Sequence, residues 1–112
     1  MSRSSQRKGR SGELELVKVL HGFGFDSVQA GEPVSYGSTP DLVGLPGIHI
    51  ECKRCEQLRL SEWMKQAQRD AERFQDGVAV IFHRRNREEW ALTLRLGDFM
   101  RFYKDWRKTN GL

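Results

Sequence analysis

The sequence predicts a single small α/β domain in which a central mixed β-sheet is flanked by helices. At 112 residues, the chain is long enough to form one hydrophobic core but too short for two domains. Apolar residues recur at helical spacing in some segments, and short apolar runs bounded by turn-forming or charged residues lie between them. No repeat or low-complexity segment interrupts this pattern. We therefore expect one folded unit over residues 11–112.

The segment before this unit, residues 1–10, is expected to be a flexible basic arm. It carries four basic side chains and no acidic one: Arg3, Arg7, Lys8 and Arg10. These charges equal the formal net charge of +4, so the basic and acidic residues of the remaining chain balance. Such an arm is suited to phosphate contacts in a nucleic acid, and a solubilising tail is the alternative explanation.

The first helix is expected over residues 11–21, because Leu16 and Leu20 share one helical face with Glu13. Gly22 favours its end. The carboxylate on this apolar face has two explanations. Glu13 can stabilise the positive end of the helix dipole, which the spacing alone favours, or it can face a functional site.

A first strand is expected over residues 26–31, with Val28 and Ala30 directed inward. The following residues, 32–38, are rich in turn formers and are expected to form a loop. Ser35 and Ser38 in this loop can donate hydrogen bonds to a phosphate, although ordinary turn chemistry explains them equally well.

The next two apolar runs, Leu42-Val43 and residues 48–50, are expected to form a hairpin. Asp41 precedes the first run and Glu51 follows the second. If residues 45–47 form a three-residue loop, the two carboxylates lie directly opposite each other and project from the same face. A two-residue loop would place them on opposite faces.

Charged groups concentrate at the open end of this hairpin. Glu51 and Lys53 share one strand face, and Cys52 points to the other. Two carboxylates and an ammonium beside buried strands are costly unless they have a partner. A divalent cation between Asp41 and Glu51 would remove that cost, and without it at least one carboxyl should have a raised pKa.

The second half of the chain supplies the remaining elements. A helix is expected over residues 61–75 with Ser61 as its N-cap, followed by a buried strand over residues 78–82. An alternating strand is expected over residues 90–94 and a final helix over residues 97–106. The final helix carries an aromatic stripe, which is more typical of a core or a dimer interface than of a surface that stacks on bases.

Several classes of protein are not indicated. No apolar run approaches the ~20 residues of a membrane span, and the basic N-terminus lacks a signal peptide's apolar stretch. We expect a protein of the bacterial cytoplasm or one associated with the nucleoid, not with a membrane, whose cysteines stay reduced. Cys52 and Cys55 form a C-x-x-C, but no second pair completes a zinc site. The histidines lack a motif context and receive no role: His21, His49 and His83. No nucleotide-binding motif is present, so no organic cofactor is expected.

The spacing Pro40-Asp41 … Glu51-Cys52-Lys53 resembles the signature of the PD-(D/E)XK nuclease superfamily. The segment Lys8-Gly9-Arg10-Ser11-Gly12-Glu13 resembles the opening helix of archaeal-type Holliday-junction resolvases and their phage relatives. The resemblance implies a restriction-endonuclease-like domain with an α-β-β-β-α-β core, of the kind that phages and prophages encode.

The resemblance also implies roles for individual residues. Mg²⁺, for which Mn²⁺ can substitute, would be held by Asp41, Glu51, the backbone carbonyl of Cys52 and, directly or through water, Glu13. Lys53 would orient or deprotonate the attacking water or stabilise negative charge. Gln66 on the second helix would support the site and contact nucleic acid, although a solvated helix surface also explains it.

These expectations converge on a Mg²⁺-dependent DNA endonuclease acting on branched DNA such as Holliday junctions. Symmetric cutting of a junction would require a homodimer. A nuclease of the same chemistry acting on flaps, nicked duplex or single strands is an alternative. A third possibility is a non-catalytic nucleic-acid-binding module, but a pure binder gains nothing from acidic groups that face phosphates.

Overall fold

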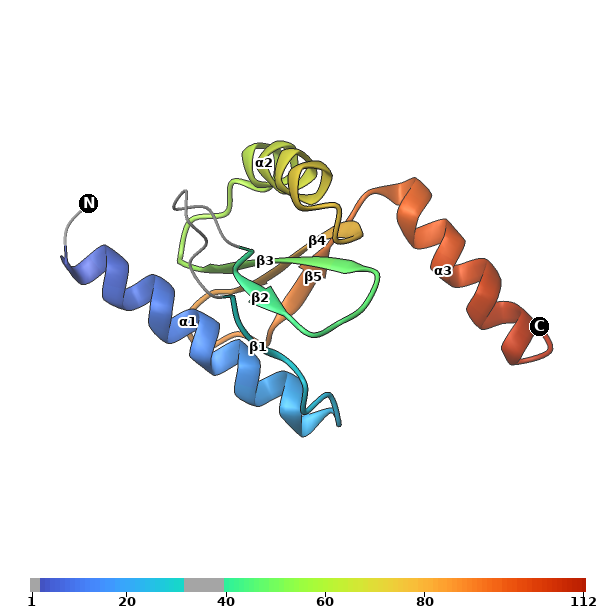
Figure 1. Ribbon diagram of the computed structural model, residues 1–112, viewed down its shortest axis with the longest axis horizontal. Coiled ribbons are helices and arrows are strands. Elements are labelled where there is room, and N and C mark those ends of the chain that lie inside the picture. The colour runs from blue at the N-terminus through green and yellow to red at the C-terminus, as the bar shows by residue number, and fades with distance from the viewer. Residues whose placement is uncertain (1–2, 32–39) are drawn as a thin grey trace.

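A computed structural model describes residues 3–31 and 40–112, with backbone alone for residues 3–10. Within these residues it contains three helices and a five-stranded mixed sheet (Figure 1), which confirms the predicted α/β class. The elements are α1 (Arg3–Gly22), β1 (Gln29–Ala30), β2 (Leu42–Val43), β3 (Ile48–Arg54), α2 (Leu60–Phe74), β4 (Val78–Arg84), β5 (Ala91–Thr93) and α3 (Leu96–Thr109). The proposed phosphate contacts at Ser35 and Ser38 lie outside the described residues.

Helix α1 begins at Arg3, eight residues before its predicted start at Ser11. The backbone of residues 3–10, which was expected to be a flexible arm, forms the first part of α1. Serine, glutamine, arginine and lysine all tolerate helical geometry, but they have no apolar spacing to signal it. The four basic residues consequently lie along a helix.

The sheet has the strand order β1-β2-β3-β4-β5. The first three strands are antiparallel, β3 and β4 are parallel, and β5 is antiparallel to β4. The parallel pair is joined through α2, because parallel strands need a crossover connection. This pair is the longest in the sheet and runs from Ile48 opposite Val78 to Arg54 opposite Arg84.

Of the two loop lengths considered, the hairpin has the three-residue one, which the interpretation as a metal site required. Leu42 lies opposite Ile50, so Asp41 lies opposite Glu51 across a three-residue loop. The turn is built on Gly44 and Gly47, whose φ angles are 116° and 88°. Residues with a side chain rarely adopt such angles, so these glycines allow the loop length that brings the carboxylates onto one face.

Each face of the sheet is covered by one helix, and Figure 1 shows α1 and α2 on opposite sides. The core on the α1 side contains Leu16, Leu20, Val28, Leu42, Ile50, Val80 and Phe82. The core on the α2 side contains Trp63, Ala67, Ala71, Ala79 and Ile81. Small alanines let α2 lie close to the sheet, so polar residues of β3 on this face become buried beneath it.

Helix α2 starts at Leu60, and its N-cap is Arg59, which makes no side-chain cap hydrogen bond. The predicted N-cap, Ser61, instead lies inside the first turn, so that prediction is wrong by two residues. The helix ends at Phe74, and Gln75 follows in the left-handed conformation with φ 50°. This turn redirects the chain towards β4.

Helix α3 extends away from the sheet in Figure 1. Asp98 is its only buried residue, held by ion pairs with Arg95 and Arg101. The aromatic residues of the predicted stripe are exposed: Phe99, Phe102, Tyr103 and Trp106. Within the described part of the chain, no helix combines the length and the apolar character needed to cross a membrane.

Candidate functional site

The site is centred on the two opposed carboxylates at the end of the hairpin. Asp41 precedes β2, and its Oδ2 accepts a hydrogen bond from the backbone N–H of Cys52 at 2.7 Å. Burial and the neighbouring Glu51 charge raise the pKa of Asp41 to about 6, although the Cys52 N–H and the charge of Lys53 oppose the rise. The expectation that at least one carboxyl has a raised pKa is therefore confirmed.

Glu51 lies on the α2 face of β3 and is 4% exposed. Its Oε1 accepts a hydrogen bond from Nε2 of His49 at 2.8 Å. The other ring nitrogen, Nδ1, lies 2.9 Å from both carboxylate oxygens of Asp76. The imidazole of His49 is completely buried and stacks against Phe74 with ring centroids 6.3 Å apart. The buried ring of His49 therefore links the carboxylates of Glu51 and Asp76. These two residues are 25 positions apart in the sequence, and the fold brings them together.

The pKa of His49 is raised to about 9, even though burial alone would lower it. The hydrogen bonds and charges of Glu51 and Asp76 outweigh the cost of burial, so the ring is an imidazolium at neutral pH and donates from both nitrogens. No role was predicted for His49 from the sequence, whereas the structure makes it the hydrogen-bond partner of both Glu51 and Asp76. Its position, two residues before Glu51 in a buried strand, was the available signal, because a buried polar ring requires partners.

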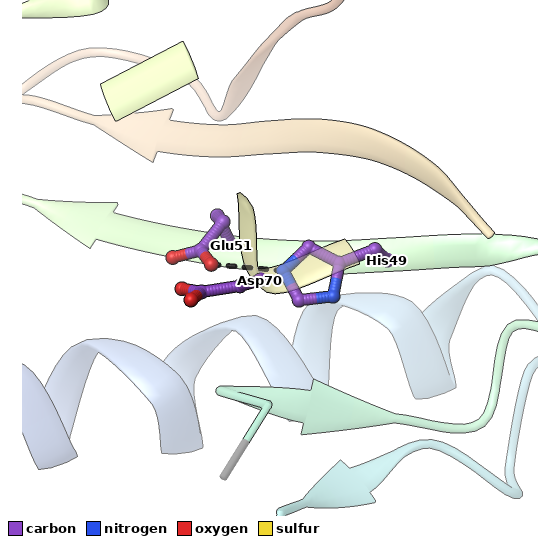
Figure 2. Close-up of side chains that lie close together, drawn as sticks. All are labelled: His49, Glu51 and Asp70. Atoms are coloured by element: carbon purple, nitrogen blue, oxygen red, sulfur yellow. Dashed lines mark hydrogen bonds and ion pairs between the residues drawn. The ribbon is translucent and has the colours of Figure 1, made fainter. Parts of the chain in front are cut away.

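Helix α2 contributes Asp70 to this group. Possible ligand atoms of His49, Glu51 and Asp70 all lie within 4.8 Å of one another (Figure 2). Gln66, the residue predicted on α2, lies one turn earlier and is exposed. No local pattern in the sequence singles out Asp70, because its proximity to Glu51 depends on how α2 packs across the sheet.

Lys53 lies two residues after Glu51 on the same strand face, as predicted. Its Nζ is 5.9 Å from the ring centroid of Trp63, within reach of a cation–π interaction. Its charge lowers the pKa of Asp41, so the ammonium is electrostatically coupled to the carboxylate pair. Trp63 limits where this flexible side chain can point.

Glu13 lies on α1, which covers the opposite face of the sheet. Burial raises the pKa of the Cys52 thiol, and the charges of Asp41 and Glu13 raise it further. Glu13 is therefore near the site, but among the described residues neither Glu13 nor Asp41 belongs to the group of His49, Glu51 and Asp70, whose candidate ligand atoms lie within 4.8 Å of one another. The structure does not bring Glu13 into direct ligand geometry, and its role through water stays a prediction.

Close packing of α1 on β3 explains this placement of Glu13. A Cβ added to Gly12 would lie 2.5 Å from Cβ of Arg54, which is too close for two carbon atoms. Glycine therefore lets α1 approach the end of β3. This contact places Glu13, the next residue, beside the strand end that carries Glu51, Cys52 and Lys53.

The donor set fits a hard divalent cation. Glu51 and Asp70 offer carboxylate oxygens close to each other, and Asp41 offers another from the position opposite Glu51. Carboxylate oxygens are the ligands that Mg²⁺ and Mn²⁺ prefer. A cation would also offset the charge that raises the pKa of Asp41. Both nitrogens of His49 are engaged with carboxylates, so the ring acts as a donor to Glu51 in this arrangement. Comparison of the chain with protein-family models, curated proteins and solved structures finds no match.

Proposed function

We propose that the protein is a Mg²⁺-dependent DNA endonuclease whose site is formed by Asp41, Glu51 and Lys53. The observation that carries this proposal is the opposition of the two carboxylates across β2 and β3, with the raised pKa of Asp41. A pair of close, partly buried carboxylates destabilises the metal-free fold, so a cation-dependent role explains their placement better than a structural one.

Each residue of the site would have a separate role in the proposed hydrolysis. When bound, Mg²⁺ would lower the pKa of a water molecule and offset negative charge on the phosphodiester. Asp41 and Glu51 would hold the cation, with Asp70 and the carbonyl of Cys52 as further oxygen donors. The Lys53 ammonium would orient the water or stabilise charge on the phosphate, and its contact with Trp63 restricts it to this side of the strand.

DNA is the substrate that the charge distribution favours. The basic residues of the first ten positions supply the net charge of +4. They lie on the first turns of α1, and the next turn of that helix packs on the end of β3 at Gly12. We propose that this part of α1 contacts phosphates and guides the backbone towards the carboxylates. Binding should then weaken steeply with added salt.

We propose branched DNA, such as a four-way junction, as the target and a homodimer as the working form. The sequence resemblance supports the target.

The exposed aromatic stripe of α3 supports an association between two copies, because isolated helices of this length are marginal without tertiary packing. An apolar groove of about 620 Å³ lies beside the start of α3, between the sheet and Phe23 of the α1 end. Light scattering coupled to size exclusion would test this, and a monomer at working concentrations would exclude the homodimer.

Cleavage of a labelled synthetic four-way junction tests the proposal directly. Linear duplex, flap, nicked and single-stranded DNA serve as competing substrates, with Mg²⁺ or with EDTA. Asp41→Asn removes one carboxylate, and Asp26→Asn is the matched control at an exposed position. Paired nicks in the junction that vanish with EDTA and Asp41→Asn support the proposal.

The other outcomes separate the alternatives. Metal-dependent cutting of the other substrates alone keeps the chemistry and rejects the junction as target. Salt-sensitive DNA binding without any cutting, unchanged by Asp41→Asn, would identify a binding module and reject the nuclease.

A further inference from the structure

We infer that Asp76 and His49 are positioning residues that hold the Glu51 carboxylate in the orientation needed to bind the cation. This inference rests on the proposed function, because Glu51 is one of the proposed ligands. Neither Asp76 nor His49 belongs to the sequence signature that the chain resembles.

A buried hydrogen bond joins His49 to Glu51. Nε2 and Oε1 are 2.8 Å apart, and the side chains are 0% and 6% exposed. A buried glutamate without such a donor would have several rotamers and no fixed direction for its second oxygen. The bond from His49 fixes Oε1, and because the carboxylate is planar it also fixes the direction of Oε2.

Asp76 and Phe74 orient the His49 ring itself. Asp76 places both carboxylate oxygens 2.9 Å from Nδ1, and its side chain is 28% exposed. Phe74 stacks on the face of the ring at an interplanar angle of 14°. The ring is thus held at both nitrogens and on one face. Because the left-handed residue Gln75 separates Phe74 from Asp76, the turn at the end of α2 brings both to His49.

A third carboxylate lies beside this hydrogen-bonded pair. Asp70 of α2 has a candidate ligand oxygen within 4.8 Å of those of His49 and Glu51. The contacts of the ring therefore hold the Glu51 carboxylate next to a further oxygen donor for a cation. Partners that orient a metal ligand in this way typically change metal affinity or activity by about 10–100-fold when they are removed.

The test measures Mn²⁺ binding to the full chain by the electron paramagnetic resonance signal of free Mn²⁺, which requires no cleavage. Asp76→Ala removes the acceptor for Nδ1, whereas Asp76→Asn keeps a side-chain oxygen there. His49→Gln removes the ring. Two substitutions away from the site are controls, His21→Gln and Asp26→Ala. Circular dichroism and thermal unfolding verify that each variant is folded.

We expect Asp76→Ala and His49→Gln to weaken Mn²⁺ binding by about 10–100-fold, with a smaller loss in Asp76→Asn and none in the controls. A folded Asp76→Ala variant with unchanged Mn²⁺ affinity would overturn the inference. If it fails in this way while the wild type binds Mn²⁺ and cleaves DNA, the proposed function stands. A wild type that binds no Mn²⁺ overturns the metal centre and this inference together.

Discussion

The substitution Asp41→Asn should stabilise the metal-free protein above neutral pH. The pKa of Asp41 rises from its ordinary value of 3.8 to about 6 in the folded chain, through burial first and the charge of Glu51 second. The folded state therefore binds this proton more tightly than the unfolded state does. It follows that the charged form of Asp41 opposes folding at high pH, and that this cost disappears as pH falls.

The size of the effect follows from the linkage between proton binding and folding. One pKa unit corresponds to about 1.4 kcal/mol, so a rise from 3.8 to about 6 costs roughly 3 kcal/mol at about pH 8. The same relation leaves a cost of only about 1 kcal/mol at about pH 4.5. Asparagine carries no charge, and its side-chain oxygen can still accept the hydrogen bond from the Cys52 N–H.

Urea unfolding in EDTA at these two pH values, with the exposed Asp26→Asn as control, measures the difference. Asp41→Asn should gain about 3 kcal/mol at the higher pH, which is on the order of 10 °C in melting temperature. The gain should shrink at the lower pH. An Asp41→Asn protein that is less stable than the wild type at about pH 8, or whose gain is the same at both pH values, would refute the electrostatic reasoning.

Three further predictions concern metal, packing and backbone conformation. Mg²⁺ at about 100 times its Kd should stabilise the wild type by about 2.7 kcal/mol in thermal unfolding but not Asp41→Asn, and equal shifts would place the cation elsewhere. Gly12→Ala should destabilise because its Cβ meets Arg54, whereas Gly22→Ala, with open space around it, should not; similar urea midpoints would contradict the close packing. Gln75→Gly should raise the melting temperature by relieving the left-handed conformation, at a gain of up to ~1 kcal/mol, and a loss would argue against that conformation.

A second pH dependence concerns His49, whose folded-state pKa is raised to about 9 from 6.5. The stability from its imidazolium is fully present below the unfolded value and is lost as pH rises through about 9. His49→Gln should therefore lose most stability, relative to the wild type, below about pH 6.5 and least in alkaline buffer. Urea unfolding across this range measures the trend, and a loss that grows with pH would contradict the charged pairing.

Much of the site could be predicted because it depends on local rules. Strand alternation placed Glu51 and Lys53 on one face and Cys52 on the other. The length of the turn between Gly44 and Gly47 put Asp41 opposite Glu51, and the structure has this register. These features follow from backbone geometry within about a dozen residues, where pleat and turn conformation leave few alternatives.

The boundaries were less predictable where no side-chain pattern marks them. Helix α1 extends to Arg3 through polar residues, and α2 starts before the serine that was expected to cap it. Propensity alone allows helix in both places but does not require it. The apolar spacing that identified both helices marks only the turns that pack against the sheet.

The sequence by itself determined the α/β class, the paired carboxylates and the expectation of a perturbed carboxyl group. Only the tertiary structure decided that His49 is a buried imidazolium between Glu51 and Asp76, and that Asp70 lies beside them. Those residues come from β3, α2 and the turn that follows it, so their proximity depends on how α2 crosses the sheet. Burial then gives each hydrogen bond its importance, since an exposed histidine at the same position would have water as its partner.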